Sequence, residues 1–121
     1  MEWTFRSDQP IYTQLVEHLT QAILSGAFGP GERLPAVREL AARAGVNPNT
    51  MQRAMAELEQ SGLIHAQRTS GRFVTDDAAV IGAARHRLAR QQVAAFLAAM
   101  ARMGYDKEQV LQLLREVKED A

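Results

Sequence analysis

The sequence has no cysteine, few turn-forming residues and no long apolar run. Without cysteine, the chain of 121 residues can form neither a disulfide framework nor a thiolate metal site. Its 8 glycines and 4 prolines are too few for a collagen-like or linker-like chain. No apolar run approaches the roughly 18 residues of a membrane span, and the N-terminus lacks a basic region followed by an apolar one. We therefore expect a cytoplasmic protein with neither a signal peptide nor a membrane partner.

Neither an excess of one charge nor a catalytic motif is present. The 14 basic residues balance the 14 acidic ones, which argues against a polycation that coats nucleic acid regardless of sequence. A glycine-rich phosphate loop, a nucleophile motif and paired catalytic carboxylates are all missing. The 3 histidines have no metal-binding spacing. We expect a protein that is not an enzyme and holds no metal or cofactor.

The chain changes in character near residue 76. Residues 1–75 are interrupted by Gly, Pro, Asn and Ser, whereas residues 76–121 are rich in Ala, Gln and Arg. Because such a change in composition is typical of a domain boundary, we predict a first domain over 1–75 and a helical tail over 76–121.

The spacing of apolar residues predicts a mainly α-helical fold with one small β-hairpin. Helices are expected near residues 10–25, 36–43, 48–60 and 78–102, with a last helix after Asp106 and a hairpin over 63–75. Helix, helix, short turn, helix and hairpin is the order of a winged helix-turn-helix domain. The sequence therefore predicts such a domain, followed by a two-helix tail.

The third predicted helix begins with short polar side chains. Asn47 is a good N-cap residue and Pro48 a good first helical residue. Asn and Gln pair with adenine, and Arg pairs with guanine or phosphate. The candidate DNA contacts of this helix are Asn47, Asn49, Thr50, Gln52 and Arg53. Alternatively, Asn47 is only a cap and the others are only solvated.

Basic residues coincide with the elements that would face DNA. Residues 33–56 hold four arginines and a single acid, and residues 61–75 hold two arginines and no acid. Arg38 lies early in the second helix, where it would contact phosphate or guanine, or alternatively pair with a neighbouring acid. The hairpin tip supplies the candidate wing contacts Arg68, Thr69, Ser70, Gly71 and Arg72. Alternatively, the tip is an ordinary tight turn.

The tail carries apolar residues that two helices alone would not bury. A hairpin of two helices is too small to cover both of its apolar faces, so a second copy would supply the missing surface. The candidate residues of this dimer interface are Leu88, Phe96, Leu97, Met100, Val110 and Leu114. Alternatively, the tail packs on its own first domain and the protein is a monomer.

Three stretches of the sequence are informative together: "PIYTQL", "GAFGPGERLPAVRELAARAGVNPNTMQRAMAELEQSGLI" and "RTSGRFV". Over about residues 9–75 they closely resemble the N-terminal domain of GntR-family bacterial transcription regulators. The resemblance places Arg38, the segment 47–50 and Gly71 in the DNA-binding region. Two positions depart from the family pattern: Ala36 stands for a frequent serine, and Thr69 stands for the first wing glycine.

The short tail resembles the YtrA subfamily, whose members dimerise through such a tail. Most of the family carry a larger effector domain. The resemblance implies a homodimeric repressor of double-stranded DNA with palindromic operators, often those of transporter operons. Whether a small-molecule effector exists does not follow from the sequence. The competing hypothesis is a winged-helix module that binds another protein and not DNA. Such a module has no need to keep the arginines and polar residues named above together.

Overall fold

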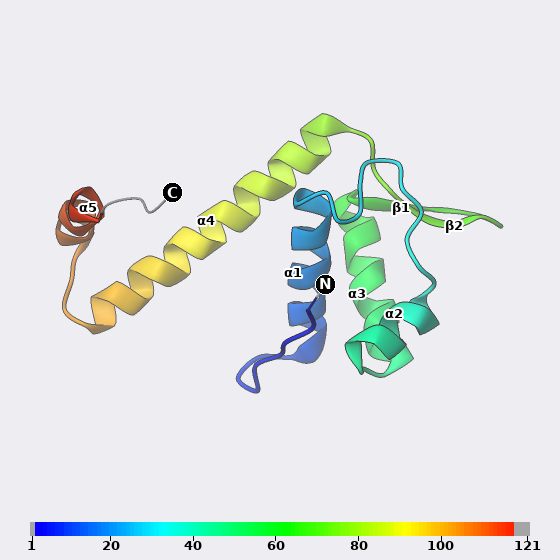
Figure 1. Ribbon diagram of the computed structural model, residues 1–121, viewed down its shortest axis with the longest axis horizontal. Coiled ribbons are helices and arrows are strands. Elements are labelled where there is room, and N and C mark those ends of the chain that lie inside the picture. The colour runs from blue at the N-terminus through cyan, green and yellow to red at the C-terminus, as the bar shows by residue number, and fades with distance from the viewer. Residues whose placement is uncertain (1, 118–121) are drawn as a thin grey trace. The chain divides into compact units, whose positions relative to one another are not determined.

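The computed structural model describes residues 2–117, which form five α-helices and one antiparallel hairpin (Figure 1). The fold class predicted from the sequence is therefore confirmed. The chain divides into two compact units, residues 1–84 and residues 85–121. None of the described helices is both long enough and apolar enough to cross a membrane.

Three helices of the first unit pack around one apolar core, to which the hairpin and the start of the fourth helix also contribute. They are α1 (Ile11–Leu24), α2 (Val37–Ala44) and α3 (Pro48–Ser61), close to the predicted ranges. Apolar residues at three- and four-residue spacing bury one face of each helix. The largest fully buried side chains of the unit are Leu15, Leu19, Leu40, Met51, Met55, Leu58, Leu63, Ile64 and Val74. Ile11, the first residue of α1, is 37% exposed and lies outside this core.

A short turn joins α2 to α3. Gly45 ends α2 in the left-handed conformation, with φ of 70°. Asn47 caps α3, because its Oδ1 accepts a hydrogen bond of 2.8 Å from the N–H of Asn49. Pro48 then occupies the first helical position, where its missing N–H costs nothing. The two helices therefore form the predicted helix-turn-helix.

The hairpin consists of β1 (Ile64–Gln67) and β2 (Gly71–Val74), which pair antiparallel. The other edge of β2 is also occupied. The N–H of Leu34 donates to the O of Arg72 at 2.8 Å, and the N–H of Val74 donates to the O of Glu32 at 2.9 Å. The connector between α1 and α2 therefore pairs with β2 along residues 31–34.

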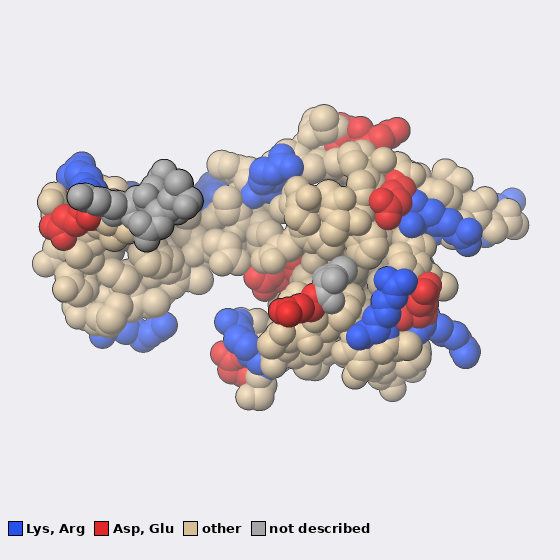
Figure 2. Space-filling view, viewed as in Figure 1, with Lys and Arg blue, Asp and Glu red and all other residues tan. Residues whose placement is uncertain are grey.

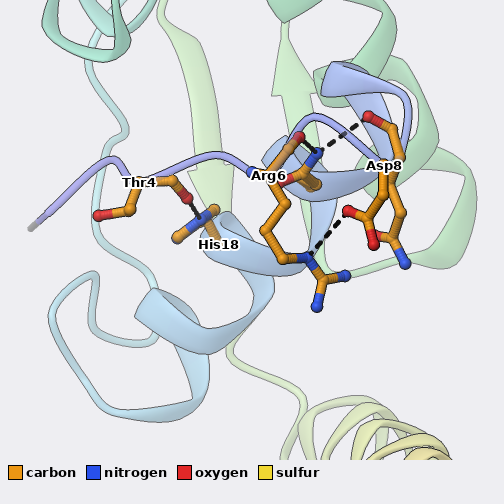
Figure 3. Close-up of polar contacts among 6 residues, drawn as sticks. Thr4, Arg6, Asp8 and His18 are labelled. Atoms are coloured by element: carbon orange, nitrogen blue, oxygen red, sulfur yellow. Dashed lines mark hydrogen bonds and ion pairs between the residues drawn. The ribbon is translucent and has the colours of Figure 1, made fainter.

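The segment before α1 is fastened to that helix by a buried glutamine. The side chain of Gln14 accepts from the N–H of Arg6 at 2.7 Å and donates to the O of Arg6 at 2.8 Å. It also donates to the O of Gln9 at 3.0 Å. Figure 3 shows this segment beside α1, with the carbonyl of Thr4 facing the His18 ring at 3.0 Å. Gln14 thus binds the backbone of the segment rather than its side chains.

The helix α4 (Ala78–Arg102) begins in the first unit and continues into the second. The N–H of Ala79 donates to Oδ1 of Asp77 at 2.9 Å, so Asp77 caps this helix. Ala84 is buried and Val80 packs against the core of the first unit. The compact units consequently divide after residue 84, about two helical turns beyond the predicted boundary.

In the second unit, Gly104 ends the α4 region and α5 (Lys107–Glu116) follows. A capping box formed by Asp106 and Gln109 begins α5. The N–H of Gln109 donates to the side chain of Asp106, and the N–H of Asp106 donates to the side chain of Gln109, both at 2.9 Å. Two helix-end donors are thereby satisfied.

Gln14→Ala should lower the free energy of unfolding by about 1–3 kcal/mol, because partly buried backbone groups lose their partners. Gln21→Ala is the matched control, since Gln21 is an exposed glutamine of the same helix. Urea unfolding of both variants, followed by circular dichroism, measures the difference. Equal stability of the two variants would contradict the anchoring role.

Candidate nucleic-acid interface

The face of α3 opposite its buried stripe is polar. Asn49, Gln52 and Arg53 are exposed there. Thr50 is only half-buried, because it lies one turn before the buried Ala54 and therefore at the edge of this face. The first two turns of α3 thus present two amides and a guanidinium to solvent, together with part of a hydroxyl side chain.

Asn47 has a structural task in the free protein. Its side-chain oxygen satisfies the N–H of Asn49 at the helix start, so the capping interpretation is confirmed. The amide nitrogen of Asn47 still has donors to offer a ligand. The prediction that Asn47 contacts DNA therefore now concerns only the N–H groups of its side-chain amide.

The arginines near α3 fall into two groups. Among the described residues, Arg38 and Arg68 are exposed and have no ion pair. Arg43 pairs with Glu39 on α2 at 2.9 Å. Figure 2 shows basic side chains where α2 and the hairpin lie in Figure 1, with acidic side chains beside them. The guanidiniums of Arg38 and Arg68 therefore have no carboxylate partner that would compete with a phosphate or a base.

Arg72 is already engaged inside the protein. It forms an ion pair with Glu59 near the end of α3, and the two side chains are 24% and 31% exposed. This pair joins β2 to α3. Arg72 therefore helps to fix the hairpin on the helix, a role that its position in the sequence did not indicate.

The tip of the hairpin is a tight turn of exposed residues. Arg68, Thr69 and Ser70 occupy it, and the N–H of Ser70 donates to the O of Gln67 at 3.0 Å. Gly71 follows with φ of 102°, a backbone region that favours glycine. A tight turn and a DNA-contacting wing both fit this geometry.

Arg33 is a basic residue of this region that was not among the predicted contacts. Its guanidinium lies over Gly71, so that a Cβ on Gly71 would meet Nε of Arg33 at 3.1 Å. The exposed Arg33 stands next to the buried Leu34 in the connector that pairs with β2. An exposed residue followed by a buried one is the alternation expected of a strand, but two residues are too few to predict a strand from the sequence.

Arg53 has a contact that the sequence did not reveal. Its Cζ atom lies 3.6 Å from the centroid of the Tyr12 ring, over the face of the ring. Tyr12 is in the first turn of α1, and α1 packs beside α3 (Figure 1). The contact therefore joins the start of α1 to the polar face of α3.

The predicted dimer-interface residues differ in exposure within the second unit. Phe96 is 44% exposed and Leu114 is 56% exposed, whereas Leu88, Leu97 and Met100 are half-buried. Val110 is only 2% exposed, so its own chain already covers it. Val93, at 56% exposed, was not predicted, although it lies three residues before Phe96 at helical spacing.

A helix-turn-helix followed by a hairpin that is fixed to the second of its helices defines the winged helix-turn-helix class of DNA-binding protein. The family described as "Bacterial regulatory proteins, gntR family" matches residues 11–74, more than half of the chain. The chain belongs to the GntR family. It is a DNA-binding transcription regulator and not an enzyme.

Two curated relatives and one solved structure extend the comparison. The uncharacterized regulator YhcF of Bacillus subtilis is 32% identical over 119 residues, which cover 98% of each chain. The transcriptional repressor YtrA of the same organism is 41% identical over 73 residues, 60% of this chain and 56% of YtrA. A GntR-family regulator from Listeria monocytogenes superposes with a TM-score of 0.82 at 35% identity, covering 94% of this chain and all of the other. The likeness to YhcF and to the Listeria structure thus includes the helical tail.

Glu59→Ala should lower the free energy of unfolding by about 1 kcal/mol, because Arg72 loses a partly shielded partner. It should also increase the rate of amide exchange in β2, since the hairpin loses its link to α3. Glu57→Ala is the control, because Glu57 is exposed on the same helix and forms no ion pair among the described residues. Hydrogen exchange followed by NMR tests both variants. Identical exchange in β2 would show that the ion pair does not hold the hairpin.

Proposed function

We propose that the protein is a sequence-specific repressor that binds a palindromic operator as a homodimer. The first unit reads one half-site and the helical tail joins two copies. The observation that carries this proposal is the exposed polar start of α3, which lies on the same unit as a fixed hairpin and the exposed Arg38 and Arg68, neither of which forms an ion pair.

In the proposed complex α3 enters the major groove and α2 crosses the DNA backbone. Asn49, Thr50, Gln52 and Arg53 would face base edges, with Asn47 as a further donor at the helix start. Arg38 would contact phosphate or guanine. The wing would reach the adjacent DNA backbone through Arg68, Thr69, Ser70 and Gly71. Arg72 would add a contact to DNA while it remains paired with Glu59. The binding energy would come largely from phosphates and the specificity from α3.

The tail supports the proposed dimer through the apolar side chains that it exposes. Phe96, Leu114 and Val93 leave about half of their surface in water. Burying one such side chain stabilises a protein by about 1.5–3 kcal/mol. A twofold partner would cover Phe96 and Leu114 together with Leu88, Leu97 and Met100, while Val110 would support the interface from inside the unit.

Repression is the regulatory direction that we propose, because YtrA is described as a repressor. The resemblance to the YtrA subfamily also points to a transporter operon as the target. A dimer on a palindrome would place two recognition helices about one helical turn apart on one side of the duplex, and the bound dimer would then obstruct transcription.

Selection from a pool of random DNA duplexes tests the DNA-binding part of the proposal. We expect an enriched palindrome, bound with an affinity that falls about 10³-fold between 50 and 200 mM salt for about six phosphate contacts. Asn49→Ala should change the preferred base at one position of each half-site and cost about 1–3 kcal/mol of specific binding. Gln60→Ala, at the far end of the same helix, should leave the preference unchanged.

An enriched but asymmetric site would contradict the palindrome. The same preference in Asn49→Ala as in the wild type would remove Asn49 from the set of base contacts. If no duplex is enriched at all, the competing protein-interaction module becomes the better hypothesis.

Phe96→Glu should convert the dimer into a monomer, because it places a carboxylate in the proposed apolar interface. The wild type should sediment at micromolar concentration near twice 13.4 kDa, and the variant near 13.4 kDa with weaker operator binding. Gln91→Glu adds the same charge at another exposed position of α4 and should remain dimeric. A monomeric wild type that binds a palindrome tightly would contradict the dimer.

A further inference from the structure

The contact between Arg53 and Tyr12 involves the face of the guanidinium. The Cζ atom lies 3.6 Å from the ring centroid of Tyr12, which is the geometry of a cation–π contact. Tyr12 is half-buried in the first turn of α1, whereas Arg53 is exposed on the polar face of α3. A partly buried ring of one helix thus supports an exposed cation of the next.

Stacking leaves the hydrogen-bonding capacity of the guanidinium unused. Its five N–H donors lie in the plane of the group, so a contact to its face leaves them available to a ligand. Arg43 and Arg72 differ, because carboxylates bind their donor edges. Arg43 on α2 and Arg53 on α3 each contact another side chain of the protein. Only Arg53 keeps its N–H donors available, because its contact is to an aromatic ring and not to a carboxylate.

We propose that Tyr12 is a positioning residue that holds Arg53 ready to bind a pair of acceptor atoms on duplex DNA. The inference rests on the proposed function, because it assumes that α3 faces DNA. The acceptors are O6 and N7 of a guanine, or two oxygens of one phosphate, and a guanidinium binds either pair through two parallel hydrogen bonds. Tyr12 itself touches no base in this proposal.

The advantage lies in the free protein. An unsupported arginine samples many rotamers, and DNA binding must then restrict it at a cost in conformational entropy. Packing of α1 beside α3 restricts the ring of Tyr12, and the ring restricts the guanidinium. Arg53 therefore meets DNA with part of that entropy already lost in folding, which strengthens binding without adding a contact.

The stacking itself can be measured without DNA. The δ-methylene protons of Arg53 should show an upfield ring-current shift in NMR spectra of the wild type and of Tyr12→Phe, which keeps the ring. Tyr12→Leu, which keeps an apolar side chain without a ring, should lose the shift. Thermal unfolding of each variant checks that it is folded. No upfield shift in a folded wild type would overturn the inference.

The effect on binding is tested with the duplex that the wild type enriches. Tyr12→Leu should weaken binding about 2- to 5-fold, in line with the strength of a cation–π contact at an exposed site, and Tyr12→Phe should bind as the wild type does. In an Arg53→Ala background, Tyr12→Leu should cause no further loss, because the group that it positions is gone. A purely structural role of Tyr12 would give the same loss in both backgrounds and would overturn the inference.

The choice of acceptor follows from Arg53→Lys, which keeps the charge but not the paired donors. Loss of preference at one base pair indicates guanine, and a uniform loss over all sequences indicates phosphate. Either result supports the positioning of Arg53 by Tyr12 if Tyr12→Leu shows the same loss as Arg53→Lys, but to a smaller extent. A wild type that enriches no duplex contradicts the proposed function, whereas an enriched duplex that Tyr12→Leu binds at full strength contradicts only the role of Tyr12.

Discussion

The rest of the first unit depends on the burial of one face of α3. Met51, Met55 and Leu58 are fully buried, in one core with Leu15 of α1 and Leu40 of α2. Each such side chain contributes about 1.5–3 kcal/mol through its removal from water. Rotation of α3 about its axis would expose all three at once. The orientation of the polar face is therefore set by the core and not by the polar residues themselves.

The hairpin is held in place on several sides. The strand β1 pairs with one edge of β2, residues 31–34 pair with the other edge, and Arg72 joins β2 to Glu59 of α3. Backbone hydrogen bonds supply two of these links, so they hold whatever side chains the strands carry. The exposed residues 68–70 at the tip are thus displayed on a rigid support.

Features with a short period or a local signature were predictable from the sequence. The buried stripe of α3, the cap at Asn47 and the capping box of Asp106 with Gln109 all depend on residues within one or two helical turns of each other. The helical spacing of the apolar residues also predicts that the polar residues at the start of α3 are exposed, which holds except for the half-buried Thr50.

Contacts between segments distant in the chain were not predictable. The stacking of Arg53 on Tyr12 and the position of Arg33 over Gly71 depend on how the helices and the hairpin pack, which no local pattern encodes. The end of the first unit after residue 84 has the same cause, because the start of α4 packs on a core formed by earlier residues. A sequence pattern thus assigns a residue to a face, and tertiary packing decides which neighbour it meets there.

The anchor at Gln14 has an evolutionary consequence. Its side chain binds only main-chain atoms, the N–H and carbonyl of Arg6 and the carbonyl of Gln9. Every residue type except proline offers the same N–H, and every residue type offers the carbonyl. Substitutions at these two positions are therefore nearly neutral for the anchor, whereas a change at Gln14 is not. Among descendants of this chain, positions 6 and 9 should accumulate substitutions quickly while the glutamine inside the helix persists.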